Sequence, residues 1–189
     1  MPPKPKFTKE EIVNAALGIV SERGADALTA KELGNALGSS ARPIFTIFNT
    51  MKEVQEEVHK AAMERFEGYA ETIFPEEMPL FKRIGMKMVL FGVQEPKLYQ
   101  LLFMQENENA VTFHDMYAIL GNTTNRCIQA LQKDYGLNVQ QAEKLFENMW
   151  IYTFGVGALC ATGVCHFSKE RLSEMLSTEF QALMGLIKA

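Results

Sequence analysis

The sequence predicts an all-α protein with an N-terminal helix-turn-helix DNA-binding domain and a C-terminal helical domain. Three observations predict this fold class. Helix-capping residues recur along the chain, and apolar residues at helical spacing follow each of them. The β-branched residues are spread along these helical patterns and form no alternating runs, so we expect no strand. Apolar residues make up 47% of the 189 residues, which is enough for a packed core.

The first expected helix follows a basic, proline-rich arm over residues 1–6. A capping box, Thr8 to Glu11, starts this helix, and apolar residues follow it at helical spacing. Gly24 is expected to end the helix.

The next two expected helices are short and lie close together in the sequence. A second capping box, Thr29 to Glu32, starts the first of them, and Gly38 stops it. Ser39 or Ser40 is expected to cap the second, with Pro43 in its first turn, where a missing N–H does no harm. Two short helices joined by a glycine-containing turn predict a helix-turn-helix, whose second helix can lie in the DNA major groove.

A third capping box, Thr50 to Glu53, starts a long helix that is expected to run to about Phe74, before Pro75 and Pro79. Beyond it we expect helices over residues 80–93, 96–104, 111–135, 138–164 and 168–187. The predicted organisation is a DNA-binding domain over residues 1–50, a connecting helix over 51–74, and a helical ligand-binding and dimerisation domain over 75–189.

The formal net charge of −4 argues against non-specific coating of nucleic acid by the whole surface. The charge is unevenly distributed, however. Between Gly38 and Lys52 the charged side chains are Arg42 and Lys52, with no acid, and the first charged residues of the chain are lysines. This asymmetry would direct one end of the molecule towards phosphate.

The cysteines and the apolar stretches indicate a cytoplasmic protein that does not cross a membrane. An odd number of cysteines, Cys127, Cys160 and Cys165, without a signal peptide indicates reduced thiols. Residues 148–168 carry no Asp, Glu, Lys or Arg, but polar and small residues dilute their apolar character, so we expect a buried helix there.

Enzyme, cofactor and metal motifs are missing from the sequence. It holds no Gly-rich phosphate loop, no nucleophile elbow and no helical HExxH, and its histidines are isolated. Cys160, Cys165 and His166 do not follow a standard zinc spacing, so buried structural cysteines are expected instead. We therefore expect neither an enzyme nor a bound cofactor or metal.

The N-terminal 55 to 70 residues resemble the DNA-binding domain of the TetR family of bacterial transcriptional regulators. The resemblance rests on an ordered set of residues: Ile12, Ala15, Ala16, Leu17, Gly24, Leu28, Thr29, Leu33, Ala36, Leu37, Gly38, Ser39, Ser40, Ile44, Phe45, Phe48, Glu53 and Val54. The later chain matches in layout, with Trp150 and Gly155 in its penultimate helix. Two positions depart from the family pattern, because Phe45 stands where Tyr is frequent and Met51 where Lys is frequent, with Lys52 beside it.

The resemblance implies that the helix-turn-helix supplies the DNA contacts. The candidate DNA-binding residues are Thr29, Lys31, Ser39, Ser40, Ala41, Arg42, Pro43, Phe45, Thr46 and Lys52. Arg42 is the best candidate for reading a base, since a guanidinium can bond both acceptors of a guanine edge, although it can equally bind phosphate. The hydroxyls of Thr29, Ser39 and Ser40 either meet phosphates or serve only as helix caps. Lys4 and Lys6 belong to an arm that either follows the DNA or remains a free tail.

One unit with so short a recognition helix makes few base contacts, so a palindromic operator bound by a homodimer is expected. Small residues at helical spacing in the penultimate helix would let two copies approach closely, and the last helix would complete the interface. The candidate interface residues are Gly157, Ala158, Ala161, Thr162, Cys165, Leu172, Met175, Phe180 and Leu183. The alternative is that the penultimate helix is simply central in its own subunit.

The middle helices are rich in phenylalanine and methionine, which suits either an adaptable apolar pocket or a plain core. The candidate ligand-binding residues are Phe81, Met88, Phe91, Phe103, Met104, Phe113, Met116, Tyr117, Trp150 and Phe154, with Tyr117, Asn122 or His114 as polar partners. The predicted function is a ligand-responsive repressor that a small apolar effector of unknown identity releases from its operator. The alternative is an all-helical interaction protein or enzyme on the same fold that has lost DNA binding.

Overall fold

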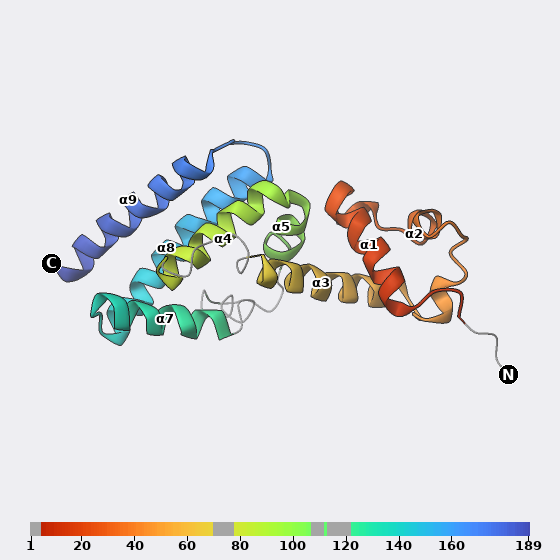
Figure 1. Cartoon of the computed structure of the whole chain (residues 1–189), viewed down its shortest axis with the longest axis horizontal. Coiled ribbons are helices and arrows are strands. Elements are labelled where there is room, and N and C mark those ends of the chain that lie inside the picture. Colours follow the sequence, from red (N-terminus) through yellow and green to blue (C-terminus); the bar gives the residue numbers. More distant parts are fainter. Residues whose placement is uncertain (1–4, 70–77, 107–111, 113–121) are drawn as a thin grey trace. The chain divides into compact units, whose positions relative to one another are not determined.

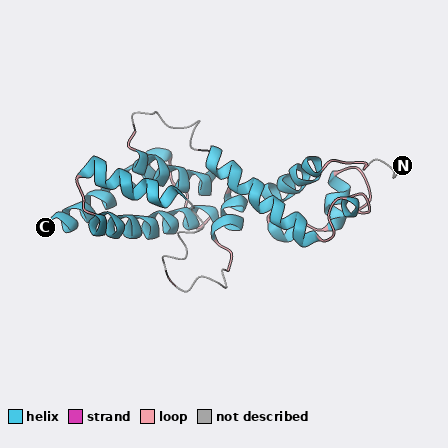
Figure 2. Ribbon diagram, turned by 90° about the horizontal axis from the view of Figure 1, so that it is seen from below, coloured by secondary structure: helices cyan, strands magenta, loops and turns pink. Residues whose placement is uncertain are grey.

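The computed structural model of the chain describes residues 5–69, 78–106, 112 and 122–189. Within these residues all regular structure is helical and no strand occurs, which confirms the predicted all-α class (Figure 2). The chain divides into two compact units. The N-terminal unit combines Met1–Gly68 with Glu95–Met104, and the C-terminal unit combines Tyr69–Gln94 with Gln105–Ala189.

The N-terminal unit is built around α1, against which α2, α3 and α5 pack (Figure 1). Its elements are α1 (Lys9–Arg23), η1 (Ala25–Ala27), α2 (Ala30–Ala36), η2 (Ile44–Thr46), α3 (Met51–Gly68) and α5 (Pro96–Phe103). Ile12, Leu33, Ile44 and Val54 are completely buried and come from four different elements. Burying such side chains is the main source of stability in a small helical domain.

Local caps start these helices, as the sequence predicts. Thr8 forms a complete capping box: its Oγ1 accepts from the Glu11 backbone N–H at 3.1 Å, and its own N–H donates to Glu11 Oε2 at 2.7 Å. Thr29 caps α2, but the Glu32 carboxylate accepts from Arg23 at 2.8 Å and does not complete the box. Capping through Thr29 Oγ1 alone is therefore enough to begin this helix.

α5 belongs to the N-terminal unit although it follows α4 in the sequence. Glu95 precedes α5 and accepts from the Ser21 hydroxyl of α1 at 3.0 Å; it also pairs with Arg65 of α3. Phe103, at the end of α5, packs edge-on against Phe66 of α3 with ring centroids 5.0 Å apart. These contacts place α5, which lies beyond the expected boundary at residue 75, with α1 and α3.

The segment after α2 differs from the prediction of a helix that begins at Ser40. The structure has only a short 3₁₀ helix, η2, whose N–H groups bond three residues back, as from Ile44 to Ala41 O and from Thr46 to Pro43 O. Neither Ser39 nor Ser40 caps it. Proline supplies no N–H and disfavours the α conformation at the residue before it, which is Arg42, so a regular α-helix is not established here.

The C-terminal unit is a bundle of helices in which α4 packs against α7, α8 and α9 (Figure 1). Its described helices are α4 (Leu80–Gln94), α7 (Asn122–Tyr135), α8 (Val139–Ala161) and α9 (Lys169–Lys188). Asn138 forms a complete capping box with Gln141, and Ser168 caps α9. The predicted ends of α4, α8 and α9 agree to within three residues, and α7 ends at Tyr135 as predicted. The expected helical segments 70–74, 111 and 113–121 lie outside the described residues, whereas Thr112 is described and is not helical.

Backbone contact brings α4 and α8 unusually close together. A Cβ placed on Gly92 of α4 would lie 2.8 Å from the carbonyl oxygen of Gly157 on α8. α8 itself ends at Ala161, three residues before the expected Val164, because Gly163 takes a φ of 72° and turns the chain. None of the helices in the described parts of the chain is both long enough and apolar enough to cross a membrane.

Candidate nucleic-acid interface and effector cavity

The turn between α2 and η2 has a fixed geometry. The Ser39 N–H donates to Gly34 O at 2.9 Å and the Gly38 N–H to Asn35 O at 3.0 Å, with Gly38 at a φ of 62°. This pair of bonds is a Schellman motif, which satisfies the last carbonyls of α2. The turn also requires a glycine at position 34, since a Cβ there would lie 2.9 Å from the Ala41 backbone nitrogen. The backbone of residues 39–41 therefore rests directly on α2.

The segment that follows presents polar and cationic side chains to solvent. Ile44 and Phe48 are buried and anchor it, whereas Ser40, Arg42 and Thr46 are exposed. Phe45 is 44% exposed although it is aromatic. An anchored segment whose outward side chains are polar is suited to contact another molecule.

The cations of the N-terminal unit fall into two groups. Several of those away from the turn are neutralised: Lys9 and Lys60 each lie 2.7 Å from Glu57, and Arg23 lies 2.8 Å from Glu32. Lys97 of α5 differs, because it is half-buried and makes no ion pair within the described residues. The hydrogen bonds from Lys60 and Lys9 lower the pKa of Glu57 from 4.5 to about 2.

The cations beside the turn are free of such partners. Within the described residues, Lys31, Arg42 and Lys52 make no ion pair, and all three are exposed. The Lys6 ammonium donates to Ser39 Oγ at 3.0 Å, so it stands at the same turn. Positive charge that no carboxylate neutralises is what a phosphate backbone requires.

The C-terminal unit contains a cavity of about 390 Å³. It is lined by residues of α4, α8 and α9 and by Tyr135 at the end of α7: Phe81, Lys82, Ile84, Gly85, Met88, Tyr135, Phe146, Met149, Trp150, Thr153, Leu176, Ser177, Phe180 and Gln181. Its size and mostly apolar, aromatic lining are typical of small-molecule sites.

Comparison with solved structures identifies the architecture. The chain is similar to a transcriptional regulator from Rhodococcus sp. Rha1, with a TM-score of 0.68, 13% identity and coverage of 95% of this chain and 97% of that chain. It is similar to the fatty acid degradation regulator FadR from Bacillus halodurans, with a TM-score of 0.63, 16% identity and coverage of 96% and 97%. It is also similar to a protein from Mesorhizobium loti MAFF303099 described as a TetR-family transcriptional regulator. The TM-score is 0.56 and the identity 17%, and the match covers 94% of this chain and 95% of that chain. No family model and no curated protein matches the sequence.

The chain has the fold of TetR-type transcriptional regulators. The resemblance expected from the sequence is thus confirmed at the level of the fold. All candidate DNA-binding residues lie in the N-terminal unit, from Thr29 to Thr46 around α2 and η2, with Lys52 on α3. Thr29 caps α2, Thr46 donates its hydroxyl to Pro43 O at 2.7 Å, and Ala41 and Pro43 are half-buried. Gly34 is the residue that sequence reasoning missed, because its role depends on a close backbone approach.

The candidate ligand-binding residues of this TetR-type fold separate into several groups. Phe81, Met88 and Trp150 line the cavity. Phe91 is buried in the core, and Phe154 is half-buried outside the lining. Phe103 and Met104 belong to the N-terminal unit and do not line the cavity. Phe113, Met116, Tyr117 and His114 lie outside the described residues, and Asn122 is exposed at the start of α7. The prediction missed the contribution of α9, since helix periodicity does not show which helices enclose a space.

The candidate dimer residues are also divided. Gly157, Ala161 and Leu172 are buried within the C-terminal unit, so they are not available to a partner. Gly157 lies at the close approach of α4 to α8, where a Cβ on Gly92 would be 2.8 Å from its carbonyl oxygen. A dimer contact at the other predicted positions stays a prediction. Phe180 lines the cavity and packs against Phe81 and Tyr135. Thr162 is exposed, and Ala158, Cys165, Met175 and Leu183 are half-buried.

Proposed function

We propose that the protein is a DNA-binding transcriptional regulator that represses its target genes as a homodimer and is released by a small effector. The observation that carries the proposal is the unneutralised positive charge at the helix-turn-helix, formed by Lys31, Arg42 and Lys52 beside an anchored and exposed segment. The fold shared with transcriptional regulators supports it. Such a regulator would act in the cytoplasm.

In this proposal the side chains of the turn divide into readers and positioners. Arg42 reads base edges in the major groove, since its guanidinium offers two donors to a guanine. Lys52, Lys31 and Ser40 bind phosphates and fix the register. Lys6, held at Ser39, extends the same basic surface.

Dimerisation is proposed through a stripe on α8 that is partly exposed in the protomer. Ile151 is 53% exposed, and Gly155, Ala158 and Thr162 follow on the same side of the helix at helical spacing. An exposed apolar stripe with small residues suits a second copy of the same helix. The cavity supplies the effector site, and the effector must bind the DNA-free state more tightly than the bound state.

A binding titration against genomic fragments of moderate length tests the DNA proposal. We expect saturable binding at moderate salt and a steep loss of affinity as salt rises. Replacing Arg42 by Ala should cost about 1–3 kcal/mol and relax sequence preference, whereas replacing Lys52 by Ala should weaken all fragments alike. Replacing Lys60, which is already paired with Glu57, is the matched control and should have little effect.

Two outcomes of the DNA-binding titration would contradict parts of the proposal. If the native protein shows no saturable binding at moderate salt, the repressor proposal is wrong and the interaction protein or enzyme on the same fold takes its place. If the Arg42 variant loses affinity uniformly across sequences, Arg42 binds phosphate and does not read bases.

Sedimentation tests the dimer. We expect a dimer at micromolar concentration and a shift to monomer when Ile151 is replaced by Glu, since a buried unpaired charge is costly. Val139 provides a matched control, because it is 52% exposed on the same helix but lies on another side of it. A monomeric native protein would contradict the proposal.

A further inference from the structure

The lining of the cavity in the C-terminal unit covers about two turns on each of two helices. Its lining begins at Phe81 and ends at Met88 on α4, and it begins at Phe146 and ends at Thr153 on α8. Both spans are seven helical steps, so each corresponds to roughly 10 Å. An apolar chain of roughly eight to ten carbon atoms therefore reaches along the cavity.

The described lining of the cavity carries positive charge only. Lys82 is the charged residue among the described side chains that line the cavity, and no Asp or Glu is among them. No ion pair involving Lys82 occurs in the described part of the chain, and the residue is only half-buried. An ammonium group beside an apolar space favours a ligand that carries one negative charge.

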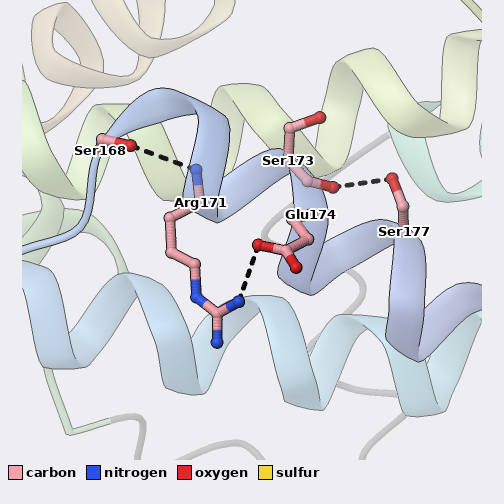
Figure 3. Close-up of polar contacts among 5 residues, drawn as sticks. All are labelled: Ser168, Arg171, Ser173, Glu174 and Ser177. Carbon is pink, nitrogen blue, oxygen red and sulfur yellow. Dashed lines mark hydrogen bonds and ion pairs between the residues drawn. The ribbon is translucent and has the colours of Figure 1, made fainter.

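Other polar groups of α7 and α9 leave this preference intact, and the remaining polar side chain of the α9 lining, Gln181, is neutral. Ser177 donates its hydroxyl to Ser173 O at 2.7 Å, so this hydroxyl turns back to its own helix (Figure 3). Arg171, on the same helix, is held by Glu174 at 2.7 Å and is not a free cation (Figure 3). Burial, and to a smaller extent the Asp134 carboxylate, raises the pKa of Tyr135, so its hydroxyl is neutral at pH 7.5; Asp134 itself does not line the cavity.

Near Thr153 the lining of the cavity is mostly apolar. Thr153 is only 4% exposed and lies on α8 opposite Gly85 of α4, where an added Cβ would be 4.0 Å from the threonine Oγ1 and 3.6 Å from Leu176 Cδ1. The missing side chain at Gly85 thus keeps this space open. Met88 and Trp150 also line the cavity, and the buried indole N–H of Trp150 has no hydrogen-bond partner among the described residues.

We propose that this cavity binds an amphipathic carboxylic acid, with its apolar tail between α4, α8 and α9 and its carboxylate beside Lys82. The inference rests on the proposed function in treating the cavity as the effector site. Burial of the tail supplies most of the affinity, and Lys82 supplies discrimination between an anion and a neutral or cationic analogue.

Fluorescence titration of the full-length protein at pH 7.5 tests the proposal. Trp150 is the single tryptophan of the chain and lines the cavity, so its emission reports on the site directly. The probes are decanoate, decanol and decylamine, which share a tail and differ in charge; 4-phenylbutanoate distinguishes an aryl tail from an alkyl tail. We expect saturable binding of decanoate, about threefold to tenfold weaker binding of decanol, and weaker binding still of decylamine.

Two variants and a control locate the site. Replacing Lys82 by Met should weaken decanoate about threefold to tenfold and leave decanol unchanged, so that the preference for the anion is lost. Replacing Gly85 by Leu fills the space near Thr153 and should weaken decanoate and decanol alike. Lys144 is exposed on α8 and does not line the cavity, so its replacement by Met should change neither.

Three results would overturn the proposal: no saturable change of Trp150 emission with either carboxylate, decanol binding as tightly as decanoate, or an unchanged preference in the Lys82 variant. Tighter binding of 4-phenylbutanoate than of decanoate would overturn a long alkyl tail as the ligand's apolar part, and the ligand would remain a carboxylic acid. The titration contains no DNA, so its failure leaves the DNA-binding proposal standing. Failure to bind DNA would likewise leave the titration result unchanged.

Discussion

Replacing Gly92 by Ala probes a backbone contact between α4 and α8 of the C-terminal unit. The added Cβ would lie 2.8 Å from the Gly157 carbonyl oxygen and 3.3 Å from the Gly157 Cα and carbonyl carbon. All three neighbours are backbone atoms, so no flexible side chain can move aside. α4 and α8 would have to separate by several tenths of an ångström along their crossing.

Two opposing effects determine the size of the change in stability. Overpacking a well-packed core typically costs about 1–3 kcal/mol. Alanine in the interior of a helix is favoured over glycine by about 1 kcal/mol. Gly155 separates the two effects, because an added Cβ there meets nothing within 4 Å. Replacing Gly155 by Ala therefore measures the helix preference alone.

Denaturant unfolding of both variants is the assay. The free energy of unfolding of the Gly92 variant should lie about 1–3 kcal/mol below that of the Gly155 variant, and its midpoint should fall with an unchanged slope. In a thermal scan, each kcal/mol lost from the free energy of unfolding should lower the melting temperature by about 2–4 °C for a chain of this size.

Equal stabilisation of the two variants would refute the reasoning, because it would mean that α4 and α8 do not meet through their backbones. Measuring the Gly155 variant at several protein concentrations is necessary as well. Gly155 lies on the stripe proposed for dimerisation, and only a concentration-independent effect belongs to the helix itself.

Three further predictions follow from the described contacts. Replacing Gly34 by Ala should destabilise the protein by about 1–3 kcal/mol relative to the same change at the open site Gly18, and it should weaken DNA binding, as fluorescence anisotropy with a labelled operator would show. Thiol labelling of the native protein should modify half-buried Cys165 first and spare Cys127, because burial raises the pKa of Cys127 to about 12. The Glu57 carboxylate, with its pKa lowered from 4.5 to about 2 by its two lysine partners, contributes stability that is present above pH 4.5 and is lost as pH falls towards 2. Replacing Glu57 by Gln should therefore flatten the pH dependence of unfolding in that window, and an unchanged dependence would contradict the ion pairs.

The starts and stops of the helices could be predicted from the sequence because they depend on residues only a few positions apart. Thr8 caps α1 and Asn138 caps α8 through bonds to the residue three positions ahead. Gly24 and Gly38 end their helices with positive φ, as expected of residues without a Cβ. The all-helical class and the resemblance in fold followed from these local features.

The tertiary structure alone decided which helices and faces come together. Small residues such as Gly157 and Ala161 suit any close helix contact, and nothing in their spacing distinguishes α4 of the same chain from α8 of a second copy. The same limit applies to the cavity, where Phe180 of α9 joins Phe81 of α4 across about a hundred positions of sequence. Local hydrogen bonds set the helices, whereas the partners of an apolar face depend on shape and volume complementarity between distant segments.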